Sequence, residues 1–145
     1  MKALYAGSFD PFTIGHFDIA ERALKLFGEL VIGVGYNESK RGELGIDQRL
    51  EAIKRVFSGN PNVTVLAYEG LTVDFARKIG AEVLVRGVRN GTEFDKEKEL
   101  ADINQEVGSL PTVFLPAKPE LSFISSSMVR ELQHNGYDVT RFLPQ

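Results

Sequence analysis

The sequence predicts an α/β fold: a doubly wound, five-stranded parallel sheet with helices on both faces. Strand-like and helix-like segments alternate along all 145 residues, which is typical of a parallel sheet covered by helices. No linker, repeat or low-complexity stretch interrupts the alternation. We therefore expect a single domain over residues 1–145, long enough to bury one core.

The first elements are defined by short apolar runs and by the glycines that end them. Residues 2–6 form the first expected strand, and Gly7 breaks it. Residues 17–27 carry apolar side chains at helical spacing, and Gly28 stops that helix. Residues 30–36 are apolar throughout, as expected of a strand covered on both faces.

The middle of the chain repeats the same order after a polar, glycine-containing loop at 37–45. An amphipathic helix is expected over 47–57, where the turn-forming residues 58–61 end it. A strand over 63–68 and a short helix over 72–79 follow. A fourth strand over 83–85 then leads into Arg86.

The last third is more polar. Thr92 is a candidate cap for a helix over 93–107 whose charges alternate in sign. A fifth strand is expected over 112–115. Ser125 or Ser126 then caps a helix that stops near residues 135–136. The order resembles a Rossmann-like fold with right-handed crossovers.

Composition excludes several functional classes. The chain is 43% hydrophobic and 26% charged, ordinary values for a soluble protein, and its net charge of -3 argues against nucleic acid as the main partner. The absence of cysteine excludes disulfides, zinc–thiolate sites and cysteine nucleophiles. No apolar run approaches the ~18 to 20 residues of a membrane span, so we expect no membrane partner and a cytoplasmic location.

The stretch from Tyr5 to His16 has the layout of a phosphate site. An apolar strand ends at Gly7, a turn stiffened by Pro11 follows, and a glycine and a histidine open a helix. Free N–H groups and the positive end of the helix dipole favour an anion at such a helix start. His16 can point at the same anion, although a histidine there could also serve only to hydrogen-bond the turn.

Polar or basic loops follow every expected strand, at the edge where ligands of open parallel sheets bind. Arg86 and Arg89 lie on one such loop, and their spacing suits a bidentate grip on phosphate, although surface ion pairs are the alternative. These loops are residues 8–16, 37–40, 71–72, 86–89 and 122–127. Because these polar and basic loops meet at one edge of the sheet, they predict a site for a phosphorylated ligand. Gly33-Val34-Gly35 resembles the start of a dinucleotide-binding fingerprint, but the rest of that motif is missing.

Three ordered motifs resemble those of the nucleotidylyltransferase superfamily, and of its bacterial phosphopantetheine adenylyltransferases in particular. The first is Gly7-Ser8-Phe9-Asp10-Pro11 with Thr13-Ile14-Gly15-His16, in which Thr13 replaces the histidine usual in the superfamily. The second is Arg86-Gly87-Val88-Arg89, and the third is Ile124-Ser125-Ser126-Ser127. The resemblance implies transfer of the adenylyl group of ATP to 4'-phosphopantetheine, giving dephospho-coenzyme A and pyrophosphate.

The same resemblance implies the roles of individual residues. His16 would stabilise the transition state, and the acceptor would be held by Ser8, Lys40, Thr72 and Arg86. Glu97 would contact ATP, although its spacing alone fits a solvated helix face, and the neighbouring Lys96 stands where relatives often have an aromatic residue. The ATP contacts implied are Ser8, Phe9, His16, Gly87, Val88, Arg89, Glu97, Leu121, Ser122, Phe123, Ile124, Ser125, Ser126 and Ser127.

Partners follow from the resemblance as well. Mg²⁺ would accompany ATP, held mainly by phosphate oxygens and water, and we expect no dedicated carboxylate site for it. Dephospho-coenzyme A or coenzyme A would bind as product or feedback ligand, and the assembly would be a homohexamer. Two alternatives stay open: a related nucleotidylyltransferase that uses CTP or another acceptor such as nicotinate mononucleotide, and a nucleotide-binding module without turnover.

Overall fold

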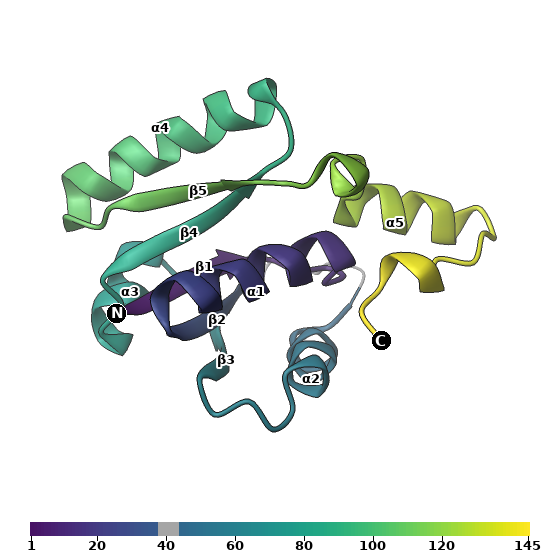
Figure 1. Ribbon diagram of the computed structural model, residues 1–145, viewed down its shortest axis with the longest axis horizontal. Helices are drawn as coiled ribbons and strands as arrows, with labels where there is room; N and C mark the ends of the chain where they lie inside the picture. The colour runs from purple at the N-terminus through teal and green to yellow at the C-terminus, as the bar shows by residue number, and fades with distance from the viewer. Residues whose placement is uncertain (38–43) are drawn as a thin grey trace.

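The computed structural model describes residues 1–37 and 44–145, which form one five-stranded parallel sheet with helices on both faces (Figure 1). The predicted fold class is therefore confirmed. The strands are β1 (Lys2–Gly7), β2 (Glu29–Gly35), β3 (Val63–Tyr68), β4 (Val83–Val88) and β5 (Thr112–Pro116). The helices are α1 (Ile14–Phe27), α2 (Ile46–Val56), α3 (Thr72–Ile79), α4 (Gly91–Gly108) and α5 (Ser126–His134), with short 3-10 turns at Pro119–Leu121 and Thr140–Phe142.

The strand order is β3-β2-β1-β4-β5, with every neighbouring pair parallel. β1 is central, and Leu4 pairs with Val31 on one side and Leu84 on the other. The chain builds outward from β1 first toward β3 and then, after α3, toward β5. The order thus reverses between β1 and β4, the place where ligands bind in doubly wound sheets.

Two apolar layers hold the helices against the sheet. Alternate side chains of β1 point to opposite faces, so Ala3 and Tyr5 belong to the layer under α1 and α2, and Leu4 and Ala6 belong to the layer under α3. α1 contributes its buried residues Ile19, Ala20 and Ala23, and α3 contributes Val73, Phe75 and Ala76. α5 lies apart from both layers, beyond the carboxyl ends of the strands (Figure 1).

The structure corrects two predicted helix starts. α1 begins at Ile14 rather than near residue 17, because Thr13 caps it. α4 begins at Gly91, and its cap is Asn90 rather than Thr92, since the Asn90 side chain accepts the hydrogen bond of the Glu93 N–H. At α5, Ser125 is the cap of the two serines considered, and its hydroxyl accepts from Met128 N–H.

Across residues 1–37 and 44–145, every helix is too short or too polar to cross a lipid bilayer.

Candidate active site

The loop after β1 has a backbone that few side chains allow. Phe9 has a positive φ of 47°, a conformation that a bulky residue rarely adopts. Its ring folds back over Gly7, where an added Cβ would lie only 3.0 Å from the ring's Cζ. Any larger residue at position 7 would force the Phe9 ring to shift, which favours the glycine found there.

α5 and the segment just before α2 hold this loop in place from outside. The Ser126 hydroxyl donates to the Pro11 carbonyl at 2.7 Å, and the Arg130 guanidinium donates to the Asp10 carbonyl. The Asp10 carboxylate accepts from the Leu44 N–H at 3.0 Å. Residues more than 100 positions apart are thus brought together, and the serine segment lies directly beside the phosphate loop.

Thr13 fixes both the position and the tautomer of His16. The two residues form a capping box: the His16 N–H donates to Thr13 Oγ1 at 3.3 Å, and the Thr13 N–H donates to His16 Nδ1 at 2.9 Å. Because Nδ1 accepts a backbone hydrogen bond, the proton of the neutral ring is on Nε2. The imidazole is therefore a hydrogen-bond donor through Nε2.

Aromatic packing keeps this imidazole uncharged. The His16 ring stacks on Phe12 with centroids 5.5 Å apart, and the edge of Phe9 meets it at 5.1 Å. Burial disfavours the charged form and lowers the pKa of His16 to about 4, and the positive charges of Arg86 and Arg89 act in the same direction. At neutral pH the His16 ring is uncharged. It can donate a hydrogen bond through its Nε2–H, but it lacks the second ring proton that an imidazolium acid would give up.

Arg86 and Glu97, both predicted ligand contacts, pair with each other. Arg86 Nε and Nη2 donate to the two Glu97 carboxylate oxygens at 2.8 and 2.7 Å, and Nη1 donates to the Ala6 carbonyl. Burial alone would lower the pKa of Arg86. The hydrogen bonds and the negative charge of Glu97 outweigh burial, so the pKa of Arg86 is raised. The bidentate pair fixes the guanidinium at the junction of β1 and β4.

Arg89 forms a second arginine–glutamate pair one turn away. Its Nη2 donates to Glu93 Oε2 at 2.6 Å, and its backbone N–H donates to Glu93 Oε1 at 3.0 Å. Glu93 and Glu97 are four residues apart on α4, so their carboxylates lie on the same helix face. Two arginines and two carboxylates therefore line the β4 side of the site, and their formal charges balance.

These elements enclose a pocket of about 250 Å³ at the strand-order reversal. It brings together His16, Arg86, Arg89 and Ser126, which come from three of the loops predicted from the sequence. The predicted residues that line it are Ser8, Phe9, His16, Arg86, Gly87, Val88, Arg89, Glu97, Leu121, Ile124, Ser125, Ser126 and Ser127.

Three predicted site residues lie outside this pocket. Ser122 donates to the Pro119 carbonyl at 3.0 Å, and Phe123 is 59% exposed and meets the ring of Phe142 edge-on. Thr72 begins α3, and its hydroxyl lies 3.0 Å from the Tyr68 hydroxyl. Lys40 falls outside the described residues.

Sequence reasoning missed three residues that the pocket places beside the others. Tyr5 lies in the wall, where burial raises the pKa of its hydroxyl and keeps it neutral. Thr13 orients His16, and Glu93 pairs with Arg89. Arg89 precedes α4 and Glu93 is its third residue, so their pairing emerges only once α4 is known to begin at Gly91.

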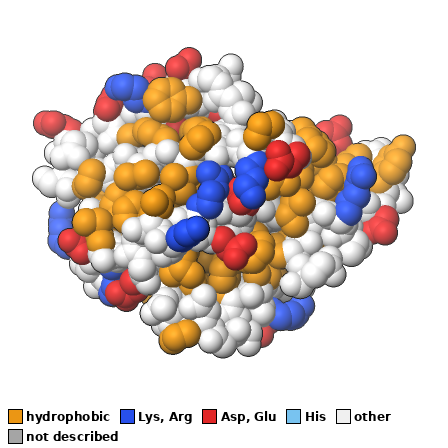
Figure 2. Space-filling model, in the orientation of Figure 1, with side chains coloured by type: hydrophobic (Ala, Val, Ile, Leu, Met, Phe, Trp, Pro, Cys, Tyr) orange, Lys and Arg blue, Asp and Glu red, His pale blue; other side chains and the backbone are white. Residues whose placement is uncertain are grey.

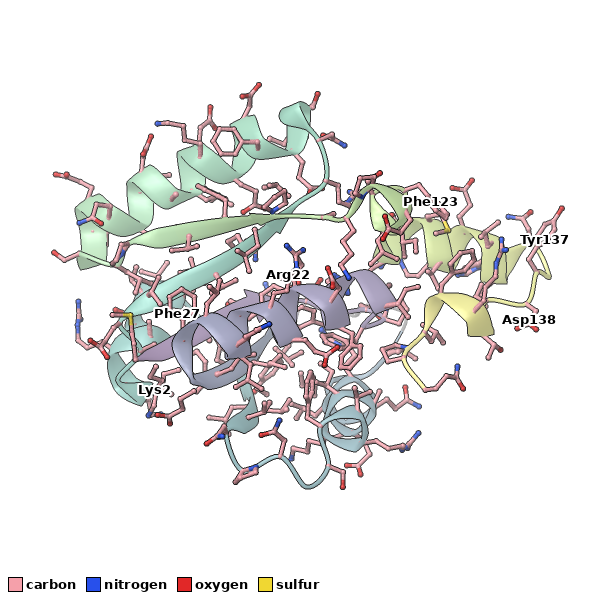
Figure 3. The ribbon with its side chains drawn as sticks, in the orientation of Figure 1. Lys2, Arg22, Phe27, Phe123, Tyr137 and Asp138 are labelled. Carbon is pink, nitrogen blue, oxygen red and sulfur yellow. The ribbon has the colours of Figure 1, made fainter. Side chains whose placement is uncertain are left out.

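Charged side chains on α1 position the segment that leads to the serines. Figure 2 shows basic and acidic side chains meeting near the centre of the visible face, and Figure 3 shows Arg22 there, rising from α1 toward β5. Arg22 pairs with Asp18 at 2.9 Å and donates to the Pro116 carbonyl at 2.7 Å. Lys118 reaches the same Asp18 carboxylate at 3.3 Å. These contacts attach the end of β5 to α1.

Within the part of the chain that the structure describes, no three histidine or carboxylate side chains are grouped closely enough to hold a metal ion.

Comparison with known proteins places this site in a family. Residues 4–132 match the family model described as cytidylyltransferase-like. The phosphopantetheine adenylyltransferase of Porphyromonas gingivalis is 50% identical over 99% of this chain and 94% of its own length. That of Phocaeicola vulgatus is 46% identical over 99% of this chain and 95% of its own.

A solved structure agrees in fold. The bifunctional NMN adenylyltransferase/ADP ribose pyrophosphatase of Francisella tularensis superposes with a TM-score of 0.77 at 14% identity, covering 99% of this chain and 45% of that one. At this identity the likeness concerns the fold alone, and this chain spans less than half of that protein. The two curated relatives, by contrast, match along nearly their whole length. The chain belongs to the cytidylyltransferase-like family and, within it, to the phosphopantetheine adenylyltransferases.

Proposed function

We propose that this protein transfers the adenylyl group of ATP to 4'-phosphopantetheine and releases pyrophosphate. A phosphate oxygen of the acceptor attacks the α-phosphorus of ATP, and the bond between the α-phosphorus and the bridging oxygen breaks with its electron pair leaving on pyrophosphate. The attacking phosphate is already anionic, so the reaction needs no general base. The observation that carries the proposal is a neutral His16, held with its Nε2–H available in a pocket that also contains Arg86, Arg89 and the start of α5.

His16 has the role of a hydrogen-bond donor to the transferred phosphate. Negative charge grows on the equatorial oxygens during such a transfer, so a fixed donor stabilises the transition state more than the bound substrates. The Thr13 cap and the Phe12 stack prevent the ring from rotating away. No reorganisation of the ring is then needed at the moment of reaction.

The start of α5 is the site for the triphosphate. Ser125 and Ser126 line the pocket together with Ser127, and the first amides of the helix have no partners within it. Arg89 supplies a cation from the β4 side of the pocket, and Glu93 holds it until a phosphate competes for the guanidinium. Gly87, Val88 and Ile124 complete the wall around ATP.

The acceptor phosphate is assigned to Arg86 and Ser8, which line the pocket. Lys40 and Thr72 are assigned to the acceptor by the resemblance alone. Arg86 is already oriented by Glu97 and Ala6, which reduces the entropy lost when it binds an anion. Glu97 lines the same pocket and pairs with Arg86, and it is kept as a proposed ATP contact. Binding would hold two mutually repulsive anions in line for attack.

Mg²⁺ is the cofactor proposed with ATP. The arginines and glutamates that line the described part of the pocket balance in charge, so a triphosphate needs further positive charge to bind there. A magnesium ion carried by the phosphates and water supplies that charge without a protein cage. Chelation of magnesium should abolish turnover, and titrating it back should restore the rate.

The decisive experiment measures pyrophosphate release from the purified protein with ATP, Mg²⁺ and 4'-phosphopantetheine. We expect release only when all three are present. CTP and nicotinate mononucleotide, tested in the same panel, should give no product. Release with either of them and not with the first pair would favour a related nucleotidylyltransferase, and nucleotide binding without any release would favour a binding module.

His16→Ala tests the assigned role of the histidine. We expect kcat to fall about 10²- to 10³-fold, the effect of removing one transition-state donor, while the Kd for ATP changes little. Parallel losses of kcat and ATP affinity would contradict the role. His134→Ala is the matched control, because His134 ends α5 and does not line the pocket.

We propose that copies of the chain assemble, with the homohexamer as the expected form. α4 supports this because Leu100, Ile103 and Val107 are more than half exposed, at 52, 55 and 61%. Apolar side chains at this spacing share a helix face that assembly would bury. Light scattering should give a mass near six times 16.1 kDa, and Leu100→Lys with Ile103→Lys should lower it.

Coenzyme A binding and a cytoplasmic location stay predictions. Dephospho-coenzyme A contains both reacting halves, so it should compete with ATP and with the acceptor. Inhibition by coenzyme A that raises the KM for both substrates would support a shared site.

A further inference from the structure

Arg49 is a buried arginine on α2 whose contacts are to backbone carbonyls. Its side chain is 7% exposed. Nη1 donates to the Ser8 carbonyl at 2.8 Å and to the Gly35 carbonyl at 3.3 Å. Nε is buried and has no hydrogen-bond partner among the described residues. The guanidinium thus joins α2, the end of β2 and the loop after β1.

Burying the Arg49 guanidinium in this way costs free energy of folding. Removing a guanidinium from water costs free energy, and an unpaired buried N–H adds to that cost. A methionine of similar length would pack the same face of α2 without either cost. The buried cation therefore points to a purpose beyond stability.

The contact with Ser8 determines which way one peptide group faces. The bond between Ser8 and Phe9 is trans, because the one cis bond in the described residues joins Asp10 to Pro11. In a trans peptide the C=O and the N–H point in opposite directions. Since the Ser8 carbonyl points at Arg49, the Phe9 N–H points away from α2.

That N–H is available for a ligand. Ser8 and Phe9 both line the pocket that holds His16. Within residues 1–37 and 44–145, the Phe9 N–H has no backbone acceptor. Phe9 also keeps its unfavourable φ of 47°, which places this peptide in a conformation that the surroundings must maintain.

We propose that Arg49 is a positioning residue for adenylyl transfer: by holding the Ser8 carbonyl, it aims the Phe9 N–H at the phosphate groups in the pocket. The inference rests on the proposed function, because it identifies that ligand as a phosphate of the substrates. Arg49 itself touches no substrate. It acts through one backbone donor and contributes a fixed positive charge behind the loop.

Arg49→Met tests the inference against Arg55→Met. Arg55 lies in the last turn of α2 and is exposed, so its variant controls for loss of an arginine from the same helix. We expect Arg49→Met to lower kcat/KM at least about tenfold and to raise the Kd for ATP about 3- to 10-fold, because one backbone donor is misdirected. Arg55→Met should leave both unchanged.

Arg49→Lys should fall between Arg49→Met and the wild type. A lysine keeps the charge and an N–H donor but lacks the planar fork. A merely structural role would instead make kcat/KM follow the melting temperature across these variants. The expected result is a loss of kcat/KM at a melting temperature close to that of the wild type.

The outcomes separate this inference from the proposed function. Folded Arg49→Met with wild-type kcat/KM and ATP affinity overturns the inference alone. If Arg49→Met does not fold, Arg49→Lys decides the question. A folded Arg49→Lys whose kcat/KM is at least about threefold lower than that of the wild type supports the inference, and one with wild-type kcat/KM and ATP affinity overturns it. A wild type that binds ATP without turnover refutes the proposed function, and the ATP titrations then decide on Arg49. A wild type that neither binds ATP nor turns over overturns both the inference and the proposed function.

Discussion

His16 illustrates how neighbouring groups prepare a single side chain. The Thr13 N–H selects the tautomer, the Phe12 ring fixes the plane, and burial with two arginines nearby removes the charge. Each effect acts on a different property of the same imidazole. The result is a donor at Nε2 that stays neutral where an ordinary histidine would begin to take up a proton.

This state of His16 can be measured by its own titration. In the ligand-free protein, the ring ¹⁵N resonances of His16 should report the Nε2–H tautomer and a midpoint near pH 4. Since this pKa lies below its unfolded value of 6.5, the unfolded chain takes up the proton first as pH falls. The contribution of His16 to stability is therefore complete above about pH 6.5 and is lost as pH falls toward 4. His134→Gln assigns the two histidines, and a His16 midpoint near 6.5 would contradict the burial argument.

At the scale of elements, α4 is the helix that supplies carboxylates to the site. Its first turns carry Glu97 against Arg86 of β4 and Glu93 against Arg89, which directly follows that strand. Its last residue packs on α3, where a Cβ added at Gly108 would lie 2.6 Å from Val73 Cβ. The close approach of the two helices at that end helps to set the direction in which the glutamates point.

Two glycines of α4 provide a matched test of this packing. Gly108→Ala should lower the free energy of unfolding by about 1–3 kcal/mol, because the new methyl group overlaps Val73. Gly91→Ala meets nothing within 4 Å and should be neutral or stabilising by up to about 1 kcal/mol. Denaturant unfolding of both variants measures the difference. Equal effects would show that the α3–α4 approach is not restrictive.

The whole molecule consists of a sheet core and a smaller apolar cluster at its carboxyl edge. Ile124, Val129, Val139 and Phe142 form this second cluster, separate from the layers that cover the sheet. Figure 3 shows Phe123, Tyr137 and Asp138 at that end of the molecule, beyond the strands. α5, which begins with the pocket's serines, therefore packs through a cluster separate from the layers that cover the sheet.

Phe142→Ala should separate these two parts. Phe142 is 5% exposed, so its truncation should loosen α5, lower ATP affinity about tenfold and leave the sheet folded. Hydrogen exchange should show faster exchange at the amides of α5 and unchanged protection in β1 and β4. Tyr137→Ala, at a residue 66% exposed, is the control. Simultaneous loss of protection in α5 and the sheet would mean that the molecule opens as one unit.

The sequence alone determined the fold class and most of the pocket wall, because local patterns encode both. Apolar runs, helical spacing and terminating glycines depend on near neighbours, and parallel strands bring the loops that follow them to one edge. His16, Arg86, Arg89 and Ser126 were predicted in this way. The same loop pattern also included Thr72, Ser122 and Phe123, and their places outside this pocket could not be read from spacing.

Only the tertiary structure decided how the charges and dipoles are arranged. The Arg86–Glu97 pair, the attachment of α5 to the turn at Pro11 and the contact of Arg49 with Ser8 join residues that are distant in the chain. Such contacts depend on the directions of side chains in three dimensions, and the spacing of residues along the sequence does not reveal those directions. Residue types can therefore indicate that a phosphate binds at this edge, whereas the packing of α2, α4 and α5 determines which donors face it.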